Sequence, residues 1–472
     1  MKTEVVKPLL GNFISSLRDV GYTFEIAVAD VLDNSIAARA KNVKILALAE
    51  PQPSFAMLDD GNGMSEEELV EAMRLATRNP DEKRAKDDLG RFGLGLKTAS
   101  FSQCQKLTVV TKKGDKISVR QWDLKLLADK NEWLLVTPSK SEIRELPLFV
   151  DFEESAQGTL VVWEGLDRYH KATFVHEIDK LRRHLALVFH RFLEGIAPTK
   201  RLKISVNNNE IKAFNPFNPD HKATQQLAEE TIKVRGSKIV VQPFVLPHHS
   251  KLSQQEYERY ATAEGYTKSQ GFYLYRANRL LIYGTWWGLH RAVDAHKLAR
   301  IKIDISNDQD RLWGIDIKKS TASPIPEIRG DLSRIISQVT EKGSRTYSGR
   351  GKKIDEKNII RFWQRLSTPD GRVRFALNKD HPLFRELEVA QDDRTLLETY
   401  MAGIQAYLPL EAIQAQLQQS PHDLDQEAVF TNEEIEILAH RLRNSSLDER
   451  YIEEFLKTEL FKSRKELLTK NA

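Results

Sequence analysis

The sequence predicts an α+β protein in which an α/β sandwich domain precedes a smaller βαβ-type domain and a mainly helical C-terminal region. Three observations carry this prediction. A nearly apolar helical stretch over 24–40 is followed by alternating strand patterns that continue to residue 163. A second group of alternating strands covers 201–305. From residue 393 onward the apolar residues recur with helical periodicity, which suits a helical bundle or a dimer contact.

Composition sets the outer limits. The chain has 472 residues, a formal charge of +4, and 40% hydrophobic residues, which is enough for two to four domains. The single cysteine, Cys104, excludes an internal disulfide framework and a cysteine-rich zinc site. No apolar run is long enough to span a bilayer, so we expect a cytoplasmic protein without a membrane partner. The mild positive charge permits nucleic-acid binding without demonstrating it.

The apolar stretch over 24–40 carries three polar residues that a buried helix rarely tolerates. Asp30 and Asn34 project from the same helix face, and Asp33 lies beside them. Burying an unpaired carboxylate is costly, so something must compensate it. Caps and ion pairs at a polar helix end are one possibility, and a metal ion or polar ligand is the other.

A strand over 54–58 runs directly into the sequence DDGNGM, from Asp59 to Met64. A strand, an acid and two closely spaced glycines predict a tight turn with close backbone approach. A plain hairpin turn also satisfies this pattern, whereas a calcium loop lacks its further acids and closing glutamate. The carboxylate of Asp59 suits a ligand donor such as the amino group of adenine. Ser65 and Glu68 form a capping box that begins the next helix.

A charged stretch over 78–88 precedes a second glycine-rich motif, GRFGLGLKTAS, which begins at Gly90. We interpret the charged stretch as a lid. A GxxGxG sequence opening a helix presents backbone N–H groups to phosphates. The motif lacks the preceding strand of a Rossmann fingerprint and the GK[ST] ending of a P-loop.

The remaining patterns predict strands and helices along the chain. The expected strands cover 42–48, 106–111, 116–122, 133–137, 158–163, a hairpin within 201–214, 231–246, 270–284, 299–305 and 372–378. The expected helices cover 171–200 and 355–366, besides those of the C-terminal region. Trp286 and Trp287 are expected in a core rather than on a base-stacking surface.

The motifs ADVLDNS, LDDGNGM, GRFGLGLK and QGTLVVW, in this order over about 10–170, resemble the GHKL ATPase superfamily with its Bergerat-type fold. The local sequence is most similar to the MORC and MutL members. The resemblance implies ATP and Mg²⁺ as ligands, with Asn34 as the metal ligand, Asp59 reading adenine, and Gly61 and Gly63 giving the base room. The implied nucleotide-binding residues are Asn34, Asp59, Gly61, Gly63, Met64, Gly90, Arg91, Phe92, Gly93, Leu94, Gly95, Leu96, Lys97 and Thr159.

The resemblance also implies catalytic residues, and here the sequence departs from its relatives. Asp30 stands where hydrolysing members carry a glutamate that activates water, and Ala37 stands where many carry aspartate. General-base work depends on reach first, so we expect slow turnover with Asp30 as the base. The stretch WGIDIKKS resembles the loop that sends a lysine to the γ-phosphate, which implies Lys319, with Lys318 as the alternative. A solvated lysine pair after a strand would look the same.

These inferences predict an ATP-binding, slowly hydrolysing enzyme that works as a nucleotide-gated homodimeric clamp on DNA or DNA-associated partners, in a setting such as bacterial defence. A chaperone-like protein remodeller and a nucleotide-binding scaffold with little turnover are the alternatives. The expected domains are an ATP-binding domain (1–170), a transducer-like domain (171–340), a basic linker (341–354) and the mainly helical region (355–472).

Overall fold

The computed structural model describes residues 3–4, 9–75, 95–196, 201–262, 264–310, 312–316, 321–352 and parts of 360–469. The described chain forms two compact units. Unit 1 comprises Met1–Leu246, Ala263–Ala292 and Lys297–Val339, and unit 2 comprises Pro247–Thr262, Val293–His296 and Thr340–Ala472. Within the described part of the chain, no helix is both long and apolar enough to cross a membrane.

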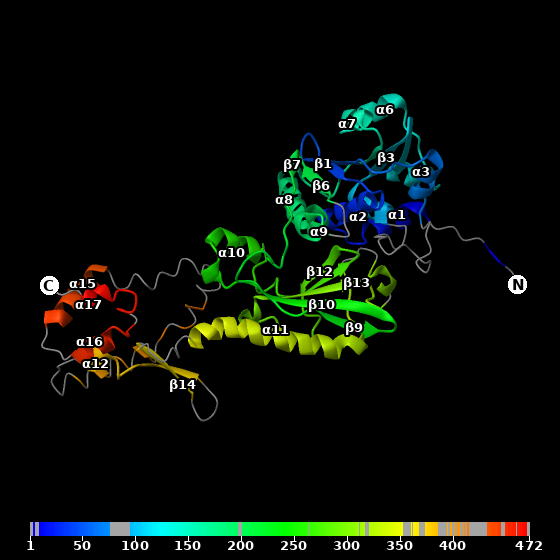
Figure 1. The fold of residues 1–472 in the computed structure, drawn as a ribbon. Coiled ribbons are helices and arrows are strands. Elements are labelled where there is room, and N and C mark those ends of the chain that lie inside the picture. Colours follow the sequence, from blue (N-terminus) through cyan, green and yellow to red (C-terminus); the bar gives the residue numbers. More distant parts are fainter. Residues whose placement is uncertain are drawn as a thin grey trace. The chain divides into compact units, whose positions relative to one another are not determined.

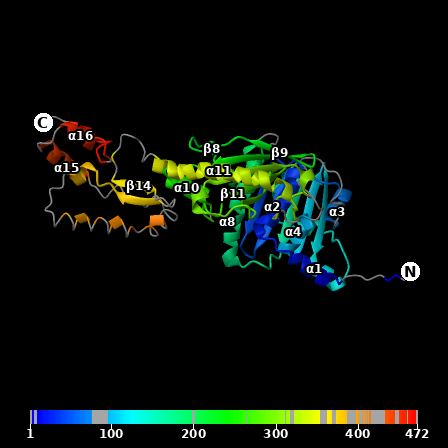
Figure 2. The same ribbon diagram turned by 90° about the horizontal axis from the view of Figure 1, so that it is seen from below.

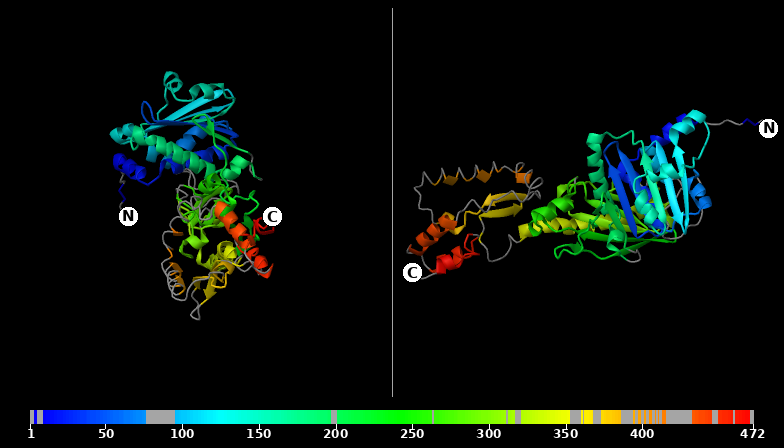
Figure 3. Two further views of the ribbon diagram at one scale, coloured as in Figure 1. Left: turned by 90° about the vertical axis from the view of Figure 1, so that its left-hand side faces the viewer. Right: turned by 90° about the horizontal axis from the view of Figure 1, so that it is seen from above.

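Unit 1 begins with a seven-stranded sheet in the order β4-β3-β5-β2-β1-β6-β7, visible as blue, cyan and green strands in Figure 3. Neighbouring strands are antiparallel except β1 and β6, which are parallel. The strands are β1 (Asn42–Leu48), β2 (Ser54–Asp59), β3 (Lys106–Lys113), β4 (Lys116–Asp123), β5 (Gly158–Glu164), β6 (Lys203–Val206) and β7 (Asn209–Glu210).

The first domain extends further along the chain than expected. The predicted hairpin within 201–214 is present, but its strand β6 pairs with β1 in the first sheet. A boundary at residue 170 would remove two strands from this sheet. It would also remove the helix that follows, whose apolar residues belong to the core described next. Of the predicted strand over 133–137, only an isolated bridge between Val136 and Gln121 is found.

Seven helices pack around one face of the first sheet or at its ends. They are α1 (Leu10–Arg18), α2 (Phe24–Ala37), α3 (Glu66–Met73), α4 (Gly95–Gln103), α5 (Leu124–Lys130), α8 (Lys171–Val188) and α9 (His190–Glu194). Helix α2 is central, and Figure 2 shows α4 beside it. Phe24 at its start is fully buried and makes edge-to-face contacts with Phe55 and Trp163. This burial is what the apolar sequence of α2 predicts.

The opposite face of the sheet is covered by α6 (Lys140–Arg144) and α7 (Phe149–Glu154), as Figure 1 shows. Phe149 and Phe152 pack against outward-facing strand residues in a second core. The alternation of the strands therefore places apolar side chains on both faces. The sheet lies between two helical layers, which is the α/β sandwich that the sequence predicts.

The rest of unit 1 is a six-stranded sheet in the order β12-β11-β13-β10-β8, with β9 paired to β10. Its strands are β8 (Gln225–Gln226), β9 (Glu230–Val234), β10 (Ser237–Val245), β11 (Gly271–Arg276), β12 (Arg279–Thr285) and β13 (Ala299–Ile305). Helix α11 (Pro326–Lys352) runs alongside β9 (Figure 1), and ion pairs Arg334–Glu230 and Arg235–Glu327 connect the two. Trp286 is buried, as expected.

Unit 2 contains α10 (Gln254–Ala261), the hairpin β14 (Trp363–Ser367) and β15 (Val373–Leu377), and short helices. These helices are α12 (Pro382–Arg385), α15 (Asn432–Asn444), α16 (Glu449–Phe455) and α17 (Glu466–Thr469). Two predictions were wrong here. The helix expected over 355–366 is strand β14 from residue 363, because that segment pairs with β15. The linker expected over 341–354 is helical as far as Lys352, as part of α11.

Candidate functional site

Asp59 ends strand β2 with a carboxylate that the protein holds on both oxygens. The side chain of Ser35, on α2, donates a hydrogen bond to Oδ2 at 2.7 Å, and the N–H of Gly61 donates to Oδ1 at 2.9 Å. Burial raises the pKa of Asp59, and the Ser35 and Gly61 hydrogen bonds oppose that rise. The result is an oriented carboxylate at the end of a strand, suited to accept from one further donor.

Two threonines on neighbouring strands stand next to this carboxylate. Thr159 on β5 lies opposite Asp59 in the antiparallel register. Its hydroxyl is 3.3 Å from that of Thr111 on β3, and the Thr111 hydroxyl accepts the N–H of Met64 at 2.9 Å. The turn after β2 is thereby attached to β3 and β5. Sequence reasoning named Asp59, Met64 and Thr159 but missed Thr111 and Ser35.

The two glycines of the turn are required by the protein's own packing. A Cβ on Gly61 would lie 2.8 Å from the Cβ of Ala38 at the end of α2. Gly63 has a φ of +63°, and a Cβ there would lie 2.0 Å from the carbonyl oxygen of Lys112 on β3. A side chain at either glycine would thus meet α2 or β3, and the role of the two glycines beside the base stays a prediction.

Helix α2 presents Asp30 and Asn34 one turn apart. Asp30 is buried, and its Oδ2 accepts the hydroxyl of Tyr22 at 3.0 Å. Its Oδ1 accepts from the guanidinium of Arg279, on β12 of the second sheet, at 3.2 Å. Asn34 is exposed, and its Nδ2 donates to the backbone carbonyl of Asp30 at 3.2 Å. Neither Tyr22 nor Arg279 belonged to the predicted site.

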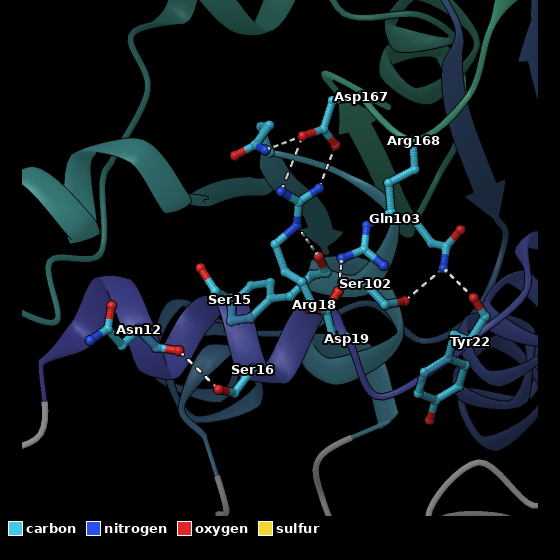
Figure 4. A network of polar contacts seen from close by, with 12 residues as sticks. Asn12, Ser15, Ser16, Arg18, Asp19, Tyr22, Ser102, Gln103, Asp167 and Arg168 are labelled. Carbon is cyan, nitrogen blue, oxygen red and sulfur yellow. Dashed lines mark hydrogen bonds and ion pairs between the residues drawn. The ribbon is translucent and has the colours of Figure 1, made fainter.

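Tyr22 is held by a polar network that reaches helices α1 and α4 (Figure 4). Gln103, at the end of α4, donates to the Tyr22 carbonyl at 3.3 Å. Arg18, at the end of α1, donates to the carbonyl of Phe101 at 3.0 Å and pairs with Asp167. This network fixes the chain that leads into α2, and so fixes the hydroxyl that contacts Asp30.

The glycine-rich motif is described only from Gly95 onward, where α4 begins. Leu96 packs against the main core. Lys97 is buried, and its ammonium donates to the carbonyl of Ala72 in the last turn of α3 at 2.9 Å, so it connects two helices. The predicted residues Gly90, Arg91, Phe92, Gly93 and Leu94, and the lid over 78–89, lie outside the described residues.

Lys318 and Lys319 also lie outside the described residues, but the segment before them is informative. Burial first, and the nearby charges of Asp30 and Asp316, raise the pKa of Tyr22, which keeps its hydroxyl protonated. The segment that leads to the lysine pair therefore comes close to Tyr22. Tyr22, and Arg279 of the second sheet, both donate to the Asp30 carboxylate.

Residues 22–159 match a family described as the histidine kinase-, DNA gyrase B- and HSP90-like ATPases. The first domain of this chain belongs to the GHKL-type ATPases. The match begins at Tyr22 and ends at Thr159, so it spans α2, the turn after β2, and the β5 threonine. The GHKL assignment made from four sequence motifs is confirmed, and it supports ATP binding generally. No curated protein matches the chain.

The site of this GHKL domain fits a magnesium ion. Mg²⁺ prefers oxygen ligands and keeps phosphates and waters in its shell, so it needs few protein ligands. The side-chain oxygen of the exposed Asn34 can serve as such a ligand, while its amide nitrogen is engaged with the Asp30 carbonyl. The buried Asp30 carboxylate lies one turn away on the same helix.

Proposed function

We propose that this protein is a magnesium-dependent ATPase in which ATP binding controls the pairing of two copies of the chain. One observation carries the proposal: within a GHKL domain, Asp30 and Asn34 lie on helix α2, and the acid Asp59 accepts a hydrogen bond from Ser35 of the same helix. Phosphoryl transfer to water needs positioning and charge neutralisation more than covalent chemistry, and this set of residues provides both.

Each residue of the site has a separate task in the proposed reaction. Asp59 accepts the adenine amino group, with Thr159 beside it, and Asn34 holds the metal ion. The metal neutralises phosphate charge when it is bound. Asp30 accepts the proton of the attacking water, and the N-terminus of α4 faces phosphate with its backbone N–H groups. Lys319, or Lys318, contacts the γ-phosphate and reports its presence to the second domain.

A hydrolysis assay with two substitutions tests the enzymatic part. Asp30→Asn is isosteric and removes the base, so we expect turnover to fall by about 100-fold or more while ATP still binds. Asp59→Asn replaces the acceptor with a group that presents a donor, so we expect ATP affinity to fall by about tenfold or more. Binding of ATP by Asp59→Asn at the wild-type affinity would refute the pocket assignment.

We further propose that the paired form acts on DNA. The chain over 341–353 reads EKGSRTYSGRGKK, so the last part of α11 and the residue after it are basic. Basic helices of this kind contact the phosphate backbone. We expect a non-hydrolysable ATP analogue to shift the protein to a dimer in sedimentation velocity, and to increase salt-sensitive binding to duplex DNA. Dimerisation without DNA binding would favour a protein client, and nucleotide binding without turnover would favour a scaffold.

A further inference from the structure

Arg279 belongs to the second sheet, yet its side chain lies buried against the acidic face of α2. Its Nη2 is 3.2 Å from Oδ1 of Asp30, and its Nε is 2.9 Å from Oδ1 of Asp33. The contact with Asp30 is a hydrogen bond as well as an ion pair, whereas that with Asp33 lacks hydrogen-bond alignment. The guanidinium also lies over the ring of Phe189, 5.7 Å from its centroid. One arginine therefore connects strand β12 to two carboxylates of the ATPase domain.

The two oxygens of Asp30 are held from different directions. Tyr22 donates to Oδ2 from the turn before α2, and Arg279 donates to Oδ1 from β12. Two fixed partners define the plane of a carboxylate, which one partner cannot do. Placement matters more for aspartate than for glutamate at this position, because aspartate has the shorter reach and a proton acceptor must lie within hydrogen-bond distance.

We propose that Arg279 is a positioning residue for ATP hydrolysis, by which the second domain orients the Asp30 carboxylate. This inference rests on the proposed function, in which Asp30 accepts the proton of water. Under this proposal the hydrolytic site is complete only when an arginine from the second domain contacts Asp30. Movement of the second domain relative to α2 would then change turnover without requiring a change at the adenine end of the site.

A second arginine also connects the two parts of unit 1, through an ion pair with a residue other than Asp30. Arg191, on α9, pairs with Asp304 on β13 at 2.5 Å and lies 3.6 Å above the ring of Tyr275. It donates side-chain hydrogen bonds to Asn278 and Asp304, which lie outside α2. Arg191 therefore provides a matched control: its removal weakens the same contact between the two parts and leaves the partners of Asp30 in place.

The other charged and titratable groups near Arg279 do not replace its charge. Burial, with a smaller effect of the Arg279 charge, lowers the pKa of His184 to about 3, so His184 is neutral at physiological pH. Tyr22 keeps its proton, and Asp33 and Asp316 are acids. Arg279 is thus a cationic partner of Asp30.

The test compares full-length Arg279→Met, Arg279→Lys and Arg191→Met with the wild type, alone and combined with Asp30→Asn. Steady-state hydrolysis gives kcat, calorimetry with a non-hydrolysable ATP analogue gives Kd, and thermal unfolding gives Tm. We expect Arg279→Met to lower kcat by about 10- to 100-fold while Kd stays within about threefold, since one charged hydrogen bond on Asp30 is lost. Arg279→Lys should recover part of kcat, because lysine keeps the charge and loses the planar fork.

Arg191→Met should lower Tm, because an ion pair between the two parts of unit 1 is lost. It should leave kcat within about twofold, because Arg191 pairs with Asp304 rather than with Asp30. In the Asp30→Asn background, Arg279→Met should have no further effect on kcat, since it acts through that carboxylate. Equal kcat values for Arg279→Met and Arg191→Met, or additive losses with Asp30→Asn, would overturn the inference alone. Full hydrolysis by Asp30→Asn would refute the proposed function and this inference together. Should Arg279→Met not fold, wild-type kcat in Arg279→Lys overturns the inference.

Discussion

Ser35→Ala is expected to change how ATP binding depends on pH. The Ser35 hydroxyl is buried and donates to Oδ2 of Asp59 at 2.7 Å. Burial raises the pKa of Asp59, and the Ser35 hydrogen bond is the largest opposing contribution. Without the hydroxyl the pKa should rise further. The adenine amino group needs the ionised carboxylate as its acceptor, so protonation of Asp59 weakens binding.

The magnitude follows from the hydrogen bond that is lost. A hydrogen bond to a charged acceptor contributes about 1.5–3 kcal/mol. Because one pKa unit corresponds to about 1.4 kcal/mol, the pH at which affinity declines should move up by about one to two units. For folding, the pH dependence runs in the opposite direction. A raised pKa means that the folded protein gains stability from Asp59 at low pH and loses it as pH rises through that pKa, and Ser35→Ala should extend this loss to higher pH.

Calorimetric Kd values for a non-hydrolysable ATP analogue between about pH 5 and pH 9 measure the effect. Thr108→Val is the matched control, because the buried Thr108 hydroxyl accepts its hydrogen bond from the side chain of Gln121, on β4, at 2.8 Å. It should lower stability and leave the pH dependence of Kd unchanged. If Ser35→Ala titrates as the wild type does, the hydroxyl does not control Asp59, and the reasoning is wrong.

Three further predictions concern the turn, the outer core and Tyr22. Gly63→Ala should lower the free energy of unfolding, measured by urea denaturation, by about 2 kcal/mol or more, because φ is +63° and the Lys112 carbonyl occupies the Cβ position. The control Gly114→Ala, where φ is +60° and the space around the Cβ is open, should cost only about 1 kcal/mol. Phe152→Ala should lower the free energy of unfolding by about 3–5 kcal/mol and leave ATP affinity unchanged, because α7 covers the outer face of the sheet. A higher Kd for ATP would contradict this assignment. Tyr22→Phe should lower kcat by about tenfold with little change in Kd, since it removes the donor to Oδ2 of Asp30; unchanged kcat would argue against that donor's role.

The parts of the site that the sequence predicted are those with local signatures. Asp59, its glycine turn and the polar residues of α2 each lie in one short motif, and the capping box at Ser65 begins α3 as expected. Ser35 left a weaker signal, a hydroxyl next to Asn34 in an otherwise apolar helix. Thr111 left none, because its role depends on the β3–β5 register, which one strand does not specify.

The errors in the fold have a similar origin. The strand pattern of residues 203–206 was predicted, but its pairing with β1 is a long-range choice that the pattern does not contain. Residues 363–366 lay in the helix predicted over 355–366, and their pairing with β15 decided otherwise. Helix α6 could have been found, because Ser139 and Glu142 form a capping box of the kind already used for α3.

Arg279 shows most clearly where sequence reasoning ends. It lies 249 residues from Asp30, on a strand whose alternation says only that one of its faces is buried. A buried arginine without partners would be severely destabilising, so its position on β12 implies acids nearby but not which ones. The acid on α2 and the arginine on β12 meet directly, with Oδ1 of Asp30 3.2 Å from the Arg279 guanidinium. The aspartate that stands where the GHKL resemblance implies a glutamate is thus the residue of α2 that bonds the second sheet.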